Sequence, residues 1–296
     1  MELRLLATFE KVADVLSFTR AAAELGYAQS SVTAQIRSLE TSLGTELFER
    51  LGGRVRLTDA GERLLPYARR LTGLAEEARA AVADTGEPAG TVAVGTMESL
   101  TSYRLPPLLE YFHHRHPKVR IALRPTLGDE TRRALRQGTY DVGFLMEAGT
   151  EHEGLESEVL APEPLVLVAG PGHPLAGRTG LTAADVAGAP LAGPEPGCAY
   201  RDLFEAELRE WSPVFLEFGT VEATKRAVAS GLGAALLPRV TVAEELASGV
   251  LTPLDWEAPF TLFTQLAWRR GKRLPAPARL FAEQARRLVR EQTPTG

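Results

Sequence analysis

Apolar residues in the first quarter of the chain recur at intervals of three and four, which is the spacing of one buried helical face. Two such faces can be followed in turn: Leu6, Phe9, Ala13 and Leu16, then Val32, Ile36, Leu39 and Leu43. Between them Ser17 is placed to cap a short helix, Thr19 to Leu25, and Gly26 and Gly44 supply stops that tolerate a left-handed backbone. The pattern predicts a helix-turn-helix whose third helix runs from about Gln29 to Leu43.

The next segment has hairpin character and leads into a long helix. Glycines turn the chain within Arg50-Leu-Gly-Gly-Arg54-Val-Arg56-Leu-Thr58, which predicts a wing. Thr58 can cap a helix to about Asp84, which Pro66 should kink or delay. Its apolar positions alternate spacings of four and three: Leu64, Ala68, Leu71, Ala75, Ala78 and Val82. This seam favours pairing with a second copy; packing on the chain's own C-terminal half is the alternative.

From Thr91 onward short β-branched runs alternate with helical ones. Strands are expected at 92–94, 120–124, 141–145 and 165–169, and helices at 103–114, 131–137, 202–210 and 221–230. The alternation is typical of largely parallel sheets. The predicted fold class is therefore α/β, with an N-terminal winged helix-turn-helix and a two-lobed C-terminal domain. We expect a winged helix-turn-helix over 1–58, a linker helix and hinge over 59–90, and a domain over 91–296, with lobe I at 91–161 plus 267–296 and lobe II at 162–266.

Composition adds a charge asymmetry to this picture. The 296 residues carry a net charge of −5, which argues against nucleic acid if charge is averaged over the chain. Between residues 50 and 70, however, six arginines face only Asp59 and Glu62. No apolar stretch is long enough to span a membrane, so no membrane partner is expected. Absence of an export signal after Met1 and a single cysteine, Cys198, fit the cytoplasm.

The outer face of the third predicted helix is a candidate for reading DNA. With the apolar positions turned inward, Ser30, Ala34 and Arg37 point outward, Thr33 lies on the flank and Gln29 at the exposed start. Hydroxyl groups reach phosphates or bases, glutamine can pair with adenine, and a helix N-terminus favours phosphate oxygens. On a lone helix such a polar face would more simply be a solvated surface than a DNA-reading one. The motif around the helix decides between these two interpretations.

That motif resembles the N-terminal region of LysR-type transcription regulators. The matching residues are Phe9-x8-Ser17-Phe18-Thr19-x-Ala21-Ala22-x2-Leu25, Gln29-Ser-Ser-Val32-Thr33-x2-Ile36-x2-Leu39-Glu40-x2-Leu43-Gly44-x2-Leu47-Phe48-x-Arg50 and Leu57-Thr58-x-Ala60-Gly61. The resemblance implies a DNA-binding set of Thr19, Gln29, Ser30, Ser31, Thr33, Arg37, Arg50, Arg54 and Arg56, on promoter DNA. It also implies a homodimer through the linker helix and a tetramer built from it. Ala28 and Ala34 depart from the serine and arginine that are common in the family.

The C-terminal half resembles, more loosely, the periplasmic-binding-protein-like domain of the same family. Matches include Thr91-Val-Ala-Val-Gly95, Gly172-His-Pro174-Leu175 and Val228-x2-Gly231-x-Gly233-x3-Leu237-Pro238. Such folds bind ligands where strand ends and helix N-termini of two lobes meet. The effector-binding candidates are Thr96, Met97, Glu98, Ser99, Thr101, Thr126, Cys198, Tyr200, Arg201, Thr220 and Glu222. Arg201 can pair with a carboxylate effector, to which the family points, whereas Glu98 and Glu222 can balance Arg201 or receive an amine.

Cys198 carries an alternative function. It lies in a helix-start turn near Arg201, where the pKa of its thiol could be lowered, and it matches in position the reactive cysteine of the family's peroxide sensors. No second cysteine is present, so an intramolecular disulfide switch is impossible. Sulfenic acid, a mixed disulfide or an intersubunit bond remain open, and the alternative function is therefore a redox-responsive regulator that uses Cys198.

The sequence otherwise predicts neither an enzyme nor a cofactor. His113, His114 and His116 have no acidic or cysteine partner at ligand spacing, so no metal is expected. Catalytic motifs are likewise missing. We expect a DNA-binding regulator that a small molecule switches. The other alternative is a solute-binding protein or enzyme that uses the α/β half, with the N-terminal helices serving assembly.

Overall fold

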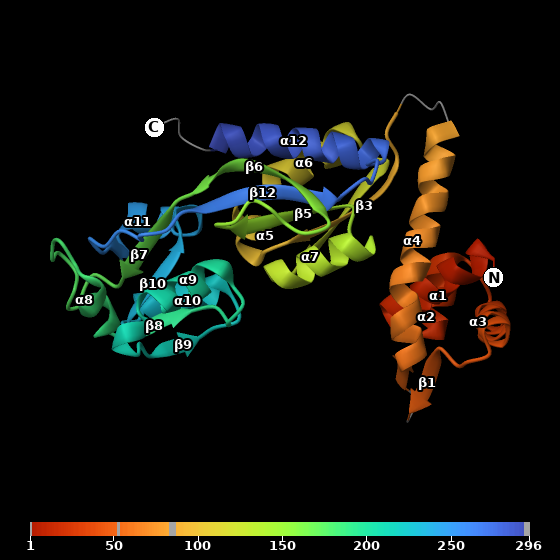
Figure 1. The fold of residues 1–296 in the computed structure, drawn as a ribbon, viewed down its shortest axis with the longest axis horizontal. Helices are drawn as coiled ribbons and strands as arrows, with labels where there is room; N and C mark the ends of the chain where they lie inside the picture. The colour runs from red at the N-terminus through yellow and green to blue at the C-terminus, as the bar shows by residue number, and fades with distance from the viewer. Residues whose placement is uncertain (1, 52–53, 83–86, 293–296) are drawn as a thin grey trace. The chain divides into compact units, whose positions relative to one another are not determined.

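The computed structural model describes residues 2–51, 54–82 and 87–292, which form two compact units (Figure 1). The first unit comprises Met1–Glu87 with Gln137–Thr139, and the second comprises Pro88–Arg136 with Tyr140–Gly296.

Three helices and a hairpin build the first unit, as predicted: α1 (Leu3–Val15), α2 (Phe18–Leu25), α3 (Gln29–Leu43), β1 (Phe48–Leu51) and β2 (Arg54–Leu57). Ser17 caps α2, since its side chain accepts a hydrogen bond from the backbone N–H of Arg20 at 3.3 Å. Gly26 and Gly44 end α2 and α3 in the left-handed conformation, with φ of 68° and 69°. Phe9 packs on Phe48 in the core, with ring centroids 5.4 Å apart.

Helix α4 (Asp59–Val82) belongs to the same unit, and one of its sides packs in the core of that unit. It begins directly after Thr58, whose hydroxyl accepts from the N–H of Gly61 at 3.1 Å, and Pro66 neither delays nor ends it. Ala68 is fully buried in the unit's core, and the Thr72 hydroxyl donates to Glu10 of α1 at 2.7 Å. The predicted seam is therefore divided, because Leu64 and Ala68 pack in the core of the unit whereas Leu71 is exposed.

The second unit contains two five-stranded mixed sheets. The first has the order β4-β3-β5-β12-β6, with β3 (Gly90–Thr96), β4 (Val119–Pro125), β5 (Val142–Glu147), β6 (Leu155–Glu163) and β12 (Leu262–Arg269). β3 pairs in parallel with β4 and β5, whereas β12 is antiparallel to β5 and β6. Its helices are α5 (Glu98–Tyr103), α6 (Pro106–Arg115), α7 (Gly128–Gln137) and α12 (Ala276–Gln292).

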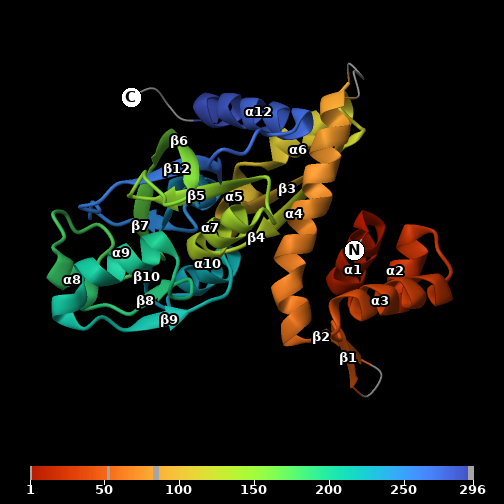
Figure 2. The same cartoon turned by 45° about the vertical axis from the view of Figure 1, so that its right-hand side comes forward.

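The second sheet has the order β11-β7-β10-β8-β9 and is the smaller one (Figure 2). Its strands are β7 (Leu165–Ala169), β8 (Leu191–Gly193), β9 (Phe215–Glu217), β10 (Ala234–Pro238) and β11 (Thr252–Pro253). Its helices are α8 (Ala183–Ala187), α9 (Ala199–Glu207), α10 (Val221–Ala229) and α11 (Ala243–Ser248), with 3-10 turns at Arg209–Trp211 and Arg239–Thr241. The strands predicted from the apolar runs are all present.

Strands β6 and β8 to β12 were not predicted, and of these β6 and β12 carry the chain between the two sheets. β6 holds Glu156 and Glu158 among its apolar positions, and β12 buries Thr264 and Gln265 completely, so neither has a clear alternating pattern. Because all of β12 pairs in the first sheet, the chain returns there at Leu262, ahead of the predicted crossing after residue 266.

A buried ion pair stabilises the point where the chain crosses between sheets. Arg104, just after α5, donates to both carboxylate oxygens of Glu163, from Nη2 at 2.8 Å and from Nε at 3.1 Å. The two side chains are 5% and 0% exposed, and Thr264 donates to the same carboxylate at 2.7 Å. Paired geometry and a third hydrogen bond offset the cost of burying both charges.

Candidate functional site

The outward face of α3 is polar and open. Val32, Ile36 and Leu39 are almost fully buried, so the helix turns the opposite side chains outward. That face forms a shallow hollow lined by Gln29, Ser30, Thr33, Ala34, Arg37, Ser38 and Thr41. Arg37 is the one charged residue of this lining and is exposed. The predicted groove-facing residues therefore share one surface.

The start of α3 leaves its backbone N–H groups available. Ala28 occupies the N-cap position and its side chain makes no capping hydrogen bond. The Thr19 hydroxyl of α2 donates to the side-chain oxygen of Gln29 at 3.4 Å, which fixes the glutamine at the helix start. An uncapped helix N-terminus of this length favours an anion such as a phosphate group.

The remaining predicted DNA-binding residues lie on or beside the hairpin and α3. Ser31 and Arg56 are exposed. The side chains of Arg50 and Arg54 lie outside the described residues, although the backbone pairs Arg50 with Val55 and Leu51 with Arg54.

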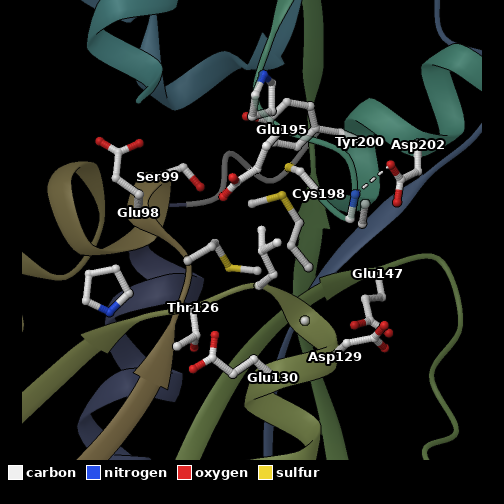
Figure 3. Close-up of a pocket in the computed structure, with 18 of the residues that line it drawn as sticks. Glu98, Ser99, Thr126, Asp129, Glu130, Glu147, Glu195, Cys198, Tyr200 and Asp202 are labelled. Carbon is white, nitrogen blue, oxygen red and sulfur yellow. Dashed lines mark hydrogen bonds between the residues drawn. The ribbon is translucent and has the colours of Figure 1, made fainter. Parts of the chain in front are cut away.

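A cleft of about 740 Å³ lies in the second unit, lined by the strand ends and helix starts of both sheets (Figure 3). Seven of the predicted effector-binding residues line it: Met97, Glu98, Ser99, Thr126, Cys198, Tyr200 and Thr220. The rule that ligand sites form at the carboxyl ends of strands therefore locates this cleft.

Four predicted residues are not in the lining. Thr96 is fully buried and its carbonyl accepts from the N–H of Thr126 at 2.7 Å, while the Thr101 hydroxyl donates to the Met97 carbonyl at 3.1 Å. Glu222 is half exposed and pairs with Lys225 at 3.1 Å and with Arg226.

Arg201 is turned away from the cleft. Its guanidinium carbon lies 3.4 Å from the centroid of the Phe215 ring, and it forms an ion pair with Glu205 one helical turn later. The side chain is 4% exposed. The structure therefore does not place this cation where it could meet a carboxylate effector.

Sequence reasoning missed most of the charge in the cleft. The lining contains six carboxylates, on Glu98, Asp129, Glu130, Glu147, Glu195 and Asp202, and one guanidinium, on Arg132. Glu147 directly ends β5, and Asp129 and Glu130 begin α7 after β4. The same strand-end rule, applied to β4 and β5 throughout, would have found these three.

Contacts between α5 and α10 join the two sides of the cleft. Glu98 accepts a hydrogen bond from the N–H of Val221 at 3.2 Å, and the Tyr103 hydroxyl donates to Glu222 at 3.4 Å. Burial raises the pKa of Tyr103 above its usual value, so this hydroxyl stays protonated as a donor. A ligand in the cleft can act on the first of these links, because Glu98 and Val221 both line the cleft.

Cys198 is the N-cap of α9 and faces the cleft, but its thiol is not activated. Burial raises the pKa of Cys198 to about 11, which outweighs hydrogen bonds from Arg201 and Tyr200 that lower it. The expectation of a lowered pKa is therefore wrong. Arg201 cannot help as a cation because it is engaged with Glu205 and Phe215.

Among the described residues, no three His, Cys, Asp or Glu side chains are grouped so that they could hold a metal ion. No described helix combines the length and the apolar character needed to cross a membrane.

Comparison with known proteins identifies the class. The family described as "Bacterial regulatory helix-turn-helix protein, lysR family" matches residues 3–62, and the "LysR substrate binding domain" matches residues 85–290. The chain belongs to the LysR family of transcriptional regulators, with an N-terminal helix-turn-helix and an effector-binding domain. Its curated relatives are named as transcriptional regulators and not as enzymes.

Three relatives illustrate how far the likeness extends. An uncharacterized HTH-type transcriptional regulator, YwqM of Bacillus subtilis (strain 168), is 39% identical, over 98% of this chain and 100% of its own. Full-length OxyR from Pseudomonas aeruginosa, in a cysteine-to-aspartate variant, has a TM-score of 0.75 and 25% identity, over 98% of this chain and 95% of its own. Full-length CbnR in complex with its target DNA has a TM-score of 0.66 and 25% identity, over 97% of this chain and 100% of its own.

Proposed function

We propose that this protein binds promoter DNA through α3 and the β1–β2 hairpin, and that a small molecule in the cleft of the second unit changes that binding. The observation that carries the proposal is the outward face of α3. It presents hydroxyl, amide and guanidinium groups beside an uncapped helix start, while its other face is locked in the core.

Each group on this face has a role suited to its chemistry. Gln29, Ser30, Thr33 and Arg37 read the major groove, where amide and guanidinium groups pair with base edges. Thr19, Ser31, Arg50, Arg54 and Arg56 hold the flanking phosphates, which supply affinity without sequence preference. The likeness to CbnR, whose structure was solved with its target DNA, supports DNA binding by this fold.

The outer side of α4 is the proposed dimer contact. Tyr67, Leu71 and Leu74 are 60%, 38% and 60% exposed, and they lie three and four residues apart on one helical stripe. Two copies that pair along this stripe bury it, and dimers of this kind assemble further into a tetramer. We assign residues 1–58 to DNA binding, 59–90 to pairing and the hinge, and 91–296 to sensing.

The cleft is the proposed sensor, and it works without a bond being made or broken. A ligand that contacts both walls stabilises the closed arrangement of the two sheets and thereby shifts the population of DNA-binding states. A redox switch at Cys198 is not favoured, because the raised pKa of its thiol leaves it protonated near neutral pH.

Promoter binding over a salt series tests the proposal, with fluorescence anisotropy of the purified protein on its own promoter and on scrambled DNA. We expect a preference of about a thousandfold or more for the promoter. Arg37→Ala and Thr33→Ala should each weaken promoter binding by about five- to a hundredfold, since a base contact is worth about 1–3 kcal/mol.

Arg4→Ala is the matched control, because Arg4 is an exposed arginine of α1 whose loss changes the net charge equally. It should leave the preference intact. Equal binding to promoter and scrambled DNA would overturn the proposal.

A further inference from the structure

We infer that the effector of this protein is an organic cation, with an amine or guanidinium head and an apolar body. The inference rests on the proposed function, in which the cleft of the second unit holds the effector. Its starting point is the charge of the lining, where six carboxylates face one guanidinium.

The one guanidinium of the lining is already engaged. Arg132 donates to both Asp129 and Glu147, which lie on α7 and at the end of β5. A carboxylate ligand would find no unpaired cation among the described residues of the lining, and it would approach the remaining acidic groups. Four of these acidic residues, Asp129, Glu130, Glu195 and Asp202, are exposed, so solvent reduces their repulsion of an anion, yet the sign of the charge still favours a cation.

Helix N-termini at the cleft give an anion little help, because each of these helices carries an acidic side chain in its first turn. Glu98 accepts the N–H of Val221 at the start of α10, and Asp202 accepts the N–H of Gly197 before α9 at 2.9 Å. Asp129 and Glu130 stand in the first turn of α7. A helix start is worth about half a positive charge, so each of these acidic groups more than cancels the dipole beside it.

Two carboxylates remain without a partner among the described residues, and they come from opposite walls. Glu130 lies on α7 of the first sheet and Glu195 follows β8 of the second, and Figure 3 shows them on opposite sides of the cavity. An ammonium group carries three donors and no acceptor, so it can pair with either carboxylate, and a cation long enough to reach both would bridge the two walls. Such a bridge would draw the two sheets together.

The rest of the lining suits an apolar body attached to that head. Met97, Leu127, Met146, Leu203 and Val221 border the cleft, so both methionines after Met1 lie there. The unbranched thioether side chain adapts to irregular ligand shapes. A hydrated metal ion would leave this apolar surface uncovered, whereas an amine with a hydrocarbon or aromatic body covers it.

Thermal unfolding with compounds of similar shape and different charge tests the inference. The probes are 2-phenylethylamine, 3-phenylpropionate and 3-phenylpropanol, and 1,5-diaminopentane with glutarate and pentane-1,5-diol, with calcium chloride added as a metal arm. A bound amine present at about ten times its Kd should raise the Tm of the second unit by about 3–6 °C. The carboxylates and alcohols of the same shape should not.

Two glutamate variants then test which side chains bind the ammonium group of the ligand. Glu130→Gln and Glu195→Gln should each weaken amine binding by about tenfold or more, since each removes one charge-assisted hydrogen bond. Glu207→Gln is the matched control, because Glu207 is an exposed glutamate of α9 outside the lining.

Three outcomes would overturn the inference: stabilisation by the carboxylates or alcohols but not by the amines, no response to either amine, or a response to calcium alone. Promoter binding measured on the same preparations separates this failure from that of the proposed function. A protein that prefers its promoter yet ignores amines remains a regulator, with an effector of another class.

Discussion

The outer face of α3 and the cleft of the second unit are both polar recognition surfaces, yet they have opposite charge. On α3 the single charged residue of the lining is Arg37, set among hydroxyl and amide groups at an uncapped helix start. In the cleft six carboxylates and one arginine line the cavity, and the helices that begin there carry acidic side chains in their first turns. The same feature, a helix N-terminus, has no acidic residue in its first turn in α3 and has at least one in each helix that begins at the cleft.

This difference explains why the net charge of −5 is a poor guide to function. An averaged charge hides the contrast between a surface of the first unit that suits polyanionic DNA and a cleft of the second unit that suits a cation. The difference in charge also keeps each ligand at its own site. The cleft repels DNA phosphates, and a cationic ligand finds no carboxylate in the lining of the α3 hollow. Substitutions that act on one region alone give the clearest tests.

The largest expected effect is a loss of stability in the second unit alone. Arg104→Met leaves the Glu163 carboxylate buried without its counter-ion, which should cost about 3–5 kcal/mol of the free energy of unfolding. The second unit should then melt about 6–20 °C lower in differential scanning calorimetry, while the first unit keeps its transition. Arg115→Met, at an exposed arginine of α6, is the control. A comparable loss in both variants would contradict the role of the ion pair.

Charge reversal on α3 should break DNA binding and leave the cleft alone. Arg37→Glu removes a base or phosphate contact and adds repulsion, so promoter affinity should fall by about a hundredfold or more in anisotropy titrations. The reverse substitution in the cleft, Glu195→Lys, should leave promoter affinity of the ligand-free protein within about threefold. If both variants lose DNA binding equally, the two regions are not independent recognition surfaces.

A smaller effect is expected for the contact along α4. Leu74→Glu replaces an exposed leucine by a charge, and each leucine buried in a dimer is worth about 1.5–3 kcal/mol. Self-association measured by analytical ultracentrifugation should weaken by at least about tenfold. Thr72→Ser, on the side of α4 that bonds to Glu10, should not change it. An unchanged dimer constant for Leu74→Glu would place the contact elsewhere.

The smallest effect is expected at Cys198. Cys198→Ser should leave promoter binding within about twofold, before and after hydrogen peroxide, because a thiol with a pKa near 11 is protonated at neutral pH. Peroxide-dependent DNA binding that is lost in this variant would contradict the account.

The raised pKa of Cys198 also gives a pH dependence. Alkylation by iodoacetamide should increase with pH up to about 11, and not level off near the ordinary value of 9.0. Since the folded state holds the proton more tightly than the unfolded one, this group stabilises the fold below pH 9 and loses that contribution as pH rises through 11. A plateau in alkylation near pH 9 would show that the thiol is not held in its neutral form.

Local signals predicted the first unit well because its elements are defined by adjacent residues. Ser17, Gly26 and Gly44 fix where α2 and α3 begin and end, and the 3.6-residue period gives the outward face of α3. That these outward residues contact DNA stays a prediction. Strands β6 and β12 escaped because their burial depends on partners far away in the sequence, such as the hydrogen bond of Thr264 to Glu163.

The cleft was harder to predict, since a strand-end rule gives positions but not side-chain directions. Arg201 follows Cys198 and Tyr200 in α9, yet the helix turns it towards Phe215 while the other two face the cavity. Glu195 and Glu130 lie far apart in the sequence, and only the folded arrangement of both sheets brings them to one site. The sequence did not reveal which way each side chain of α9 points, or that the two sheets bring Glu130 and Glu195 to the same cleft.

The central claim, that the cleft controls the DNA-reading face, is tested most directly by promoter affinity with and without ligand. Anisotropy titrations would use the compound that most raises the Tm of the second unit, at a saturating concentration. The account predicts that promoter Kd changes by about fivefold or more, and that Glu130→Gln with Glu195→Gln removes the change while Glu207→Gln keeps it. The same promoter Kd with and without a saturating ligand would contradict the claim.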